Sequence, residues 1–240
     1  MPQSKKQYVL HAFLLIYSIA LVALLIFAGK LGYIIYQSPN PETLTSLNTN
    51  FVVLDKLPPY VGAAFLASED IGYIDRPGME TRAIIKTLIR GYLNKGVVPQ
   101  EITIVQKLVK YAFTKPNAGF PRKLQEAYIA FRLQNKYSRK QILQMYINHA
   151  DFGESTSGLN AASTLYFGKK PQQLSIAEAA LLAGVVKNPA TNSPYVNPEK
   201  AYAAMNSILA TMEADGLLSK TLHQSAQEEL LSLKNNPTKK

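Results

Sequence analysis

The chain of 240 residues is long enough for one sizeable domain or two small ones. Its net charge of +10 and sequence pI near 9.6 imply an anionic neighbour: nucleic acid, anionic lipid or a phosphorylated substrate. It has no cysteine, which excludes disulfides and thiol catalysis, and its three histidines lie too far apart for a His-based metal site.

Residues 8–29 are the first predicted element, an apolar run without a fully charged side chain. Its length of roughly 20 residues is what a helix needs to cross the hydrocarbon core of a bilayer. It exceeds the apolar region of a cleaved signal peptide, roughly 7–15 residues, so we expect an uncleaved single-pass anchor. Lys5 and Lys6 precede it, which favours a cytoplasmic N-terminus and places the rest outside the cytoplasm. That location argues against nucleic acid as a partner.

The rest of the chain is predicted to form one domain with short flanks. We expect a cytoplasmic tip and membrane anchor over residues 1–36, a polar linker over 37–50, a globular domain over 51–233 and a basic tail over 234–240. Apolar residues in the domain recur with a helical period, and no alternating run indicates a sheet. The predicted fold class is therefore mainly α, with at most a short hairpin.

Periodicity and capping residues set the expected helices of the domain. They cover residues 58–70, 81–93, 102–113, 121–134, 138–148, 159–166, 175–186 and 199–217. The third begins with β-branched residues, which leaves a strand open there, and the last is expected to be the final helix. The segment 175–186 is apolar nearly all round and is expected at the centre of the core. Its Ser175 and Glu178 have capping-box spacing, which favours a structural role for Glu178.

Two adjacent acids, Glu69 and Asp70, end the first helix of the domain, and Gly72 then breaks it. Acids normally favour the opposite end of a helix, where the dipole is positive. An acid here, flanked by apolar residues, is suited to general acid/base chemistry. The alternative is a solvated helix end, which the spacing alone favours.

A mixed charge cluster, Arg122, Lys123 and Glu126, projects from one side of the helix over 121–134. One interpretation is a surface ion-pair cluster of little energetic value. The other is a carboxylate held by two cations beside a phosphate or sugar site.

Taken together, these segments resemble the peptidoglycan glycosyltransferases (family 51), which polymerise lipid II and occur as monofunctional enzymes or as the first domain of penicillin-binding proteins. The resemblance runs from about residue 57 to 218 and keeps the family's order. The first motif, E-D-x-x-F-x-x-H-x-G, matches residues 69–78, with Tyr73 for Phe and Arg76 for His. The motif R-K-x-x-E-A is intact at 122–127. Further matches cover residues 139–153, 158–169 and 174–184.

The second motif of the family, G-G-S-T-x-x-Q-Q-L-x-K-N, is altered where it falls on residues 100–111. Thr103, Gln106, Leu108 and Lys110 agree with it. Both glycines, the serine, the second glutamine and the asparagine are replaced, and Lys107 stands at the second glutamine. The exchange puts a point charge where the pattern has a neutral amide, and that charge can still hold a pyrophosphate oxygen.

The resemblance implies a lysozyme-like helical domain in which Glu69 is the general base and Glu126 orients cations or a metal. It implies Mg²⁺ as a cofactor. The residues implied in substrate binding are Asp70, Arg76, Thr103, Gln106, Lys107, Lys110, Arg122 and Lys123. The implied partners are lipid II, the growing glycan strand, membrane lipid and other cell-wall synthesis proteins, at the bacterial inner membrane.

Two other functions stay open at this level. The altered second motif is also consistent with a catalytically impaired relative that binds lipid II or glycan as a scaffold. A lysozyme-like hydrolase also uses a glutamate at a helix end. The intact Arg-Lys-x-x-Glu cluster argues against a hydrolase, because cleavage of a neutral sugar bond leaves no pyrophosphate to hold.

Overall fold

The computed structural model describes residues 2–45, 51–70, 72–73, 103–113 and 120–235. Within these ranges the regular structure is helical, and the single β-bridge is an antiparallel pairing of Asp151 with Ser157. The mainly α fold class is therefore confirmed. The helix expected over residues 81–93 lies outside the described residues.

The helices of the described ranges follow in chain order. Their bounds are α1 Pro2–Tyr36, η1 Pro41–Thr45, η2 Leu54–Lys56, α2 Pro59–Glu69, α4 Ile104–Phe113, α5 Phe120–Lys136, α6 Arg139–His149, α7 Leu159–Phe167, η3 Pro171–Gln173, α8 Ile176–Lys187, α9 Pro189–Asn192, α10 Pro198–Ala214 and α11 Lys220–Asn235. Residues 104–113 are thus helical, which decides between the helix and the strand that their β-branched start left open.

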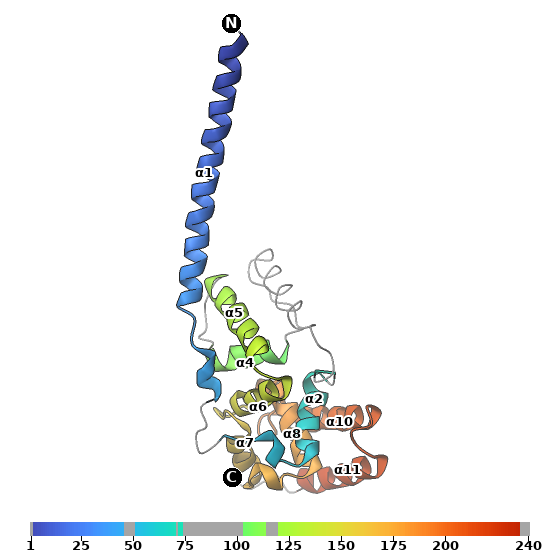
Figure 1. The fold of residues 1–240 in the computed structure, drawn as a ribbon. Coiled ribbons are helices and arrows are strands. Elements are labelled where there is room, and N and C mark those ends of the chain that lie inside the picture. The colour runs from blue at the N-terminus through green and yellow to red at the C-terminus, as the bar shows by residue number, and fades with distance from the viewer. Residues whose placement is uncertain (1, 46–50, 71, 74–102, 114–119, 236–240) are drawn as a thin grey trace.

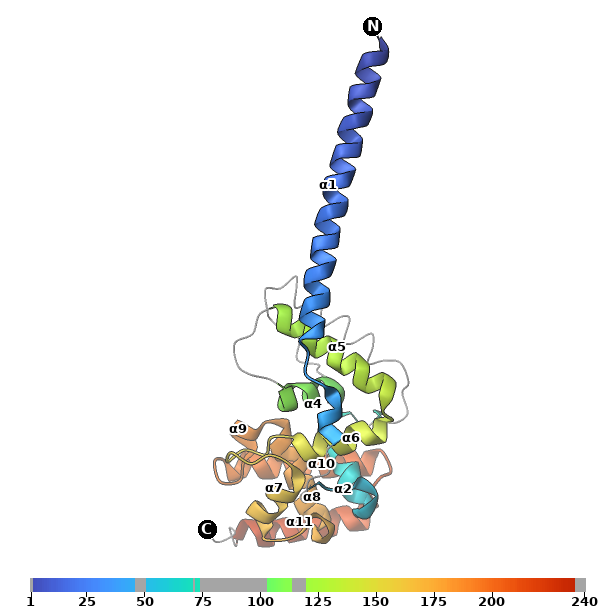
Figure 2. The same ribbon diagram turned by 60° about the vertical axis from the view of Figure 1, so that its left-hand side comes forward.

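Helix α1 projects from the domain, and α5 is the helix that lies against its C-terminal end (Figures 1 and 2). A side-chain hydrogen bond joins the two, from Gln125 Nε2 to the Ile34 carbonyl at 2.8 Å. Among the described residues, α1 is the one helix long and apolar enough to cross a membrane, and none of its most apolar stretch is buried. The predicted anchor is thus a continuous helix.

Part of the predicted linker is ordered against the domain. Residues 41–45 form the 3₁₀ helix η1, in which Leu44 is buried. Glu42 of η1 forms an ion pair with Lys136 of α5. A buried leucine and an ion pair to α5 therefore help to hold a segment whose polar composition predicts no structure.

Helix α8 lies at the centre of the core, as predicted from its apolar sequence. Every residue from Ala177 to Val186 is buried. Helix α2 contacts it through Ser68 Oγ, which donates to the Ala183 carbonyl at 2.9 Å. A Cβ at Gly184 would lie 3.1 Å from Ala204 Cβ, so the glycine permits the close approach of α10.

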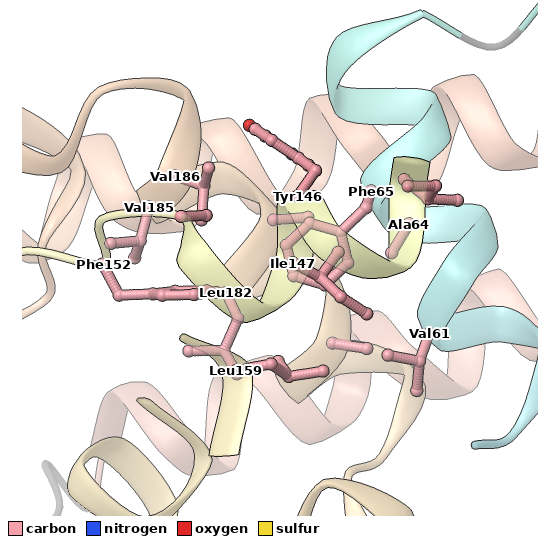
Figure 3. Close-up of a cluster of buried hydrophobic side chains, with 14 of the residues drawn as sticks. Val61, Ala64, Phe65, Tyr146, Ile147, Phe152, Leu159, Leu182, Val185 and Val186 are labelled. Atoms are coloured by element: carbon pink, nitrogen blue, oxygen red, sulfur yellow. The ribbon is translucent and has the colours of Figure 1, made fainter. Parts of the chain in front are cut away.

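Side chains from α2, α6, α7 and α8 converge in this core (Figure 3). The labelled members are Val61, Ala64, Phe65, Tyr146, Ile147, Phe152, Leu159, Leu182, Val185 and Val186. The ring of Phe65 meets that of Phe152 edge to face, with centroids 6.1 Å apart. This contact packs α2 against the segment that joins α6 to α7.

Helix α11 follows the helix that was expected to be the last, so that prediction is wrong. Gly216 ends α10 with a left-handed backbone (φ 70°), and Ser219 Oγ then accepts the Leu222 N–H at 3.3 Å. Leu218 and Ala226 are buried on this side of the domain. The sequence carries a helical spacing here, Leu222, Ala226 and Leu230, which lies beyond the end of the last predicted helix.

The capping box predicted at the start of α8 is present. Ser175 Oγ accepts the Glu178 N–H at 3.1 Å, and Glu178 Oε2 accepts the Ser175 N–H at 2.8 Å. Lys169 Nζ also contacts Glu178 Oε1 at 2.6 Å. The structural role predicted for Glu178 is confirmed.

Candidate active site

Glu69 is the last residue of α2, and its side chain is buried, with 4 % of it exposed. Asp70 ends the helix with an extended backbone, and its N–H donates to the Leu66 carbonyl at 2.9 Å. Because the apolar face of α2 packs into the core, it sets the direction in which Glu69 leaves the helix. The interpretation of a solvated helix end therefore does not hold for Glu69, whereas Asp70 is exposed.

Both carboxylate oxygens of Glu69 have a partner from another helix. Lys107 of α4 forms an ion pair with Oε2 through its Nζ. Tyr146 of α6 donates its hydroxyl to Oε1 at 2.8 Å. Three helices that are distant in sequence thus meet at one acid, where a carboxylate, an ammonium and a phenol are in contact.

Two tyrosines surround this acid as neutral groups. Burial, and then the negative charge of Glu69, raise the pKa of Tyr146 well above its usual value. Burial, followed by the charges of Glu69 and Asp151, raises the pKa of Tyr111 to about 12. The two rings lie 6.1 Å apart, centroid to centroid. At neutral pH both phenols keep their protons, so Tyr146 serves Glu69 as a hydrogen-bond donor.

A reciprocal cap made by two predicted substrate-binding residues begins α4. Gln106 N–H donates to Thr103 Oγ1 at 3.4 Å, and Thr103 N–H donates to Gln106 Oε1 at 3.1 Å. The cap fixes the start of the helix immediately before Lys107. Lys110, three residues further along α4, is exposed.

The charge cluster of the R-K-x-x-E-A segment lies on α5, which packs against α4. Arg122 Nε donates to Glu126 Oε1 at 3.2 Å, and a terminal nitrogen of Arg122 donates to the Phe113 carbonyl at 2.8 Å. The Nζ of Lys123 is buried without a hydrogen-bond partner in the described part of the chain. An ammonium in such a place favours a bound anion, since a buried charge is costly unless it is paired.

The predicted site residues fall into two groups that α4 connects. Glu69 contacts Lys107 in the first half of α4. At the other end of α4, Arg122 pairs with Glu126 and donates to the carbonyl of Phe113, the last residue of the helix. Asp70 accepts the Gly72 N–H at 3.1 Å. Arg76 lies outside the described residues.

Sequence reasoning missed Tyr146 and Tyr111 as parts of the site. Tyr146 falls in a matched motif, but its position on an apolar helix face gives no sign of the acid that it contacts. Asn148, two residues later, binds the backbone instead, since its Oδ1 accepts the Val52 N–H at 2.7 Å and its Nδ2 donates to the Val52 carbonyl at 2.8 Å. That pair ties the start of the domain to α6.

The described residues do not make a magnesium site by themselves. They contain no group of three or more acidic or imidazole side chains placed to hold a metal ion. Glu126, the carboxylate expected near a metal, is engaged by Arg122. Mg²⁺ therefore stays a prediction from the resemblance, and it enters no step of the proposed reaction.

A model of the transglycosylase family matches residues 38–213, most of the chain after α1. The chain belongs to the transglycosylase family. The matched range contains every helix that contributes to the site, from α2 to α6. Family membership supports peptidoglycan glycan polymerisation as the general class of activity.

Among the relatives of this transglycosylase-family chain are three penicillin-binding proteins. Penicillin-binding protein 1A of Aquifex aeolicus is 33 % identical over 77 % of this chain and 25 % of its own length. Penicillin-binding protein 1F of Bacillus subtilis is 34 % identical over 81 % of this chain and 28 % of its own. Penicillin-binding protein 1A of Mycobacterium tuberculosis is 36 % identical over 70 % and 21 %. The chain thus spans about a quarter of the length of these relatives.

Proposed function

We propose that this protein polymerises lipid II into β-1,4-linked glycan strands, with inversion at the anomeric carbon and release of undecaprenyl pyrophosphate. The observation that carries the proposal is the setting of Glu69. This buried carboxylate at the end of α2 contacts the ammonium of Lys107 and the phenol of Tyr146. The helices α4 and α5, which pack against each other, carry further cations. Family membership supplies the general class of reaction.

In the proposed reaction Glu69 is the general base. It takes the proton from the 4-hydroxyl of the acceptor sugar, and the oxygen attacks the anomeric carbon of the growing chain. The bond from that carbon to the diphosphate breaks, and its electron pair leaves with the diphosphate. The hydroxyl of Tyr146 donates to Oε1 and keeps the carboxylate in one orientation. A general base must be held in this way so that its oxygen faces the proton it removes.

Cations stabilise the departing diphosphate in this proposal. Its charge is concentrated and no protein nucleophile is needed, so electrostatic stabilisation carries much of the catalysis. The ammonium of Lys123, buried without a hydrogen-bond partner among the described residues, would bind a phosphate oxygen. Glu126 and the Phe113 carbonyl orient the guanidinium of Arg122, and Lys110 is exposed on the neighbouring helix.

The setting proposed for the reaction is the bacterial inner membrane. Helix α1 would span it with the N-terminus in the cytoplasm, so that the domain faces the lipid-linked substrate outside. The partners would be lipid II, the growing strand, membrane lipid and other cell-wall synthesis proteins. The apolar, exposed surface of α1 supports this arrangement.

The test is polymerisation of lipid II by the wild type and by Glu69→Gln. We expect the variant to lose at least about a hundredfold in rate, the size of a general-base contribution, while circular dichroism shows retained helix. The matched control is Glu178→Gln, since Glu178 is also a buried glutamate paired with a lysine, away from the proposed reaction. It should lower stability and leave the turnover of the folded protein intact. Full activity of Glu69→Gln would refute the role of Glu69.

A second candidate function is a scaffold that binds lipid II or glycan without polymerising it. The observation in its favour is that both oxygens of Glu69 are already engaged and that its side chain is 4 % exposed. The same assay separates the two functions. Binding of lipid II without chain formation would favour the scaffold.

A further inference from the structure

Because only 4 % of the Glu69 side chain is exposed, the hydroxyl of an acceptor sugar can reach its carboxylate only if one of the two partners withdraws. Tyr146 Oη holds Oε1 from a side chain that is fully buried in the core. Its ring contacts Tyr111, and displacing it would open a cavity. Lys107 holds Oε2 from the surface side of α4, and 22 % of its side chain is exposed. Since the lysine stem is a flexible chain of four carbons, Lys107 is the partner that can leave.

Further cations lie on α4 itself and on α5, the helix packed against it, and would attract an anion that competes for the ammonium of Lys107. Lys110 lies three residues along the same helix, hence on the same side of it, and is exposed. Arg122 is bound to the far end of α4, and the ammonium of Lys123 on α5 is buried with no hydrogen-bond partner in the described ranges. A diphosphate drawn to these cations carries several negative charges, so it competes strongly with a single carboxylate for a lysine.

We propose that Lys107 exchanges partners, pairing with Glu69 in the free protein and with the diphosphate of a bound polyprenyl-diphosphate sugar during the reaction. This inference rests on the proposed function and adds a regulation to it: the substrate's diphosphate is what releases Oε2 of Glu69. No covalent bond changes in this step, which replaces one ion pair by another. The base is therefore free only in a site that already holds a leaving group.

Such an exchange makes diphosphate binding and the Glu69–Lys107 ion pair mutually dependent. Removing the charge of Glu69 releases Lys107 in advance, so a diphosphate should then bind more tightly. Without Lys107 that gain should nearly vanish. The coupling between two sites that share one group is typically about 5–150-fold.

The experiment is a double-mutant cycle on diphosphate affinity, with the full chain in detergent micelles and farnesyl diphosphate as the probe. Isothermal titration calorimetry would compare the wild type, Glu69→Gln, Lys107→Met and the double variant. We expect Glu69→Gln to tighten binding about tenfold when Lys107 is present and less than about threefold when Met replaces it. The control background is Lys110→Met, in which the tightening by Glu69→Gln should persist because Lys110 is not the partner of Glu69.

An equal change in both backgrounds, or no change, would overturn the exchange. If Lys107→Met fails to fold, Lys107→Gln takes its place, since an amide of similar length tolerates a buried carboxylate better. If the wild type polymerises lipid II but the mutant cycle shows no coupling, this inference alone is refuted. A wild type that neither polymerises lipid II nor binds the probe refutes the proposed function and the exchange together. The coupling without polymerisation supports the exchange in a scaffold.

Discussion

Tyr146 combines two roles in one side chain, because its ring belongs to the core and its hydroxyl contacts Glu69. Tyr146→Phe keeps the packing and removes the hydrogen bond from a buried carboxylate. We expect a loss of about 1–3 kcal/mol in the free energy of unfolding, measured with urea, and slower polymerisation of lipid II.

Tyr166 provides the matched control for this variant, since it is also buried and donates to the Phe152 carbonyl at 2.7 Å. Tyr166→Phe should lower stability while the turnover of the folded protein stays unchanged. Equal turnover losses in the two variants would contradict a specific role for Tyr146.

Tyr111 predicts a stability change at high pH. Its pKa is raised to about 12 in the folded chain, whereas an unfolded tyrosine titrates near 10. The unfolded state therefore loses its proton first, and the contribution of Tyr111 is complete below about pH 10 and lost as pH rises through about 12. Unfolding measured between pH 9 and 12 should show falling stability, and the fall should be smaller in Tyr111→Phe. If stability falls with pH as steeply in Tyr111→Phe as in the wild type, other groups cause the fall.

The sequence predicts single residues of the site better than their contacts. Glu69 stands out because it ends an apolar helix, and the capping spacing of Ser175 and Glu178 is local. Lys107 reaches Glu69 across 38 positions and Tyr146 across 77. Such pairs depend on how α2, α4 and α6 pack, and no spacing in the chain encodes that.

Gly158 precedes α7 and lies against the backbone of Asn148 in α6, and it has a backbone that L-residues rarely adopt (φ 85°). A Cβ there would lie 2.7 Å from the Asn148 carbonyl oxygen. Gly158→Ala should therefore destabilise the protein by about 3 kcal/mol or more, from backbone strain and the clash together. Chemical denaturation measures the loss.

Gly168 supplies the comparison, because it ends α7 with a similar positive φ of 64° and no atom within 4 Å of an added Cβ. Gly168→Ala should cost only about 1–2 kcal/mol, the strain of a left-handed alanine. Equal losses at the two positions would mean that the contact with Asn148 relaxes freely.

At the scale of elements, the helical period predicts most of the described helices within a few residues. α8 is identified by being apolar on all sides, and its burial follows from that. One prediction fails, and one segment of the expected linker has structure that its composition does not indicate. The helical spacing of Leu222, Ala226 and Leu230 belongs to α11 and lies beyond the predicted last helix, whereas in η1 Leu44 is buried and Glu42 pairs with Lys136 of α5.

At the scale of the molecule, the described residues form a domain and a projecting helix that adds little to the core. The most apolar stretch of α1 is unburied, so removal of residues 1–36 should leave the domain helical by circular dichroism. The full chain should sediment with membranes and the truncated chain should stay in solution. Polymerisation of lipid II in vesicles should fall by at least about tenfold, since the local concentration of the two reactants is lost. Sedimentation of both forms with membranes would show that the domain binds lipid without α1.

The hydrogen bond from Gln125 to Ile34 has a consequence for how such an enzyme would meet its substrate. The same helix, α5, contacts the end of α1 and carries Arg122 and Lys123. If α1 spans the bilayer as proposed, the groups that would receive the diphosphate stand at a fixed height above the leaflet. Enzyme and substrate would then find each other by lateral diffusion in two dimensions, and the finished polysaccharide would grow away from the lipid headgroups.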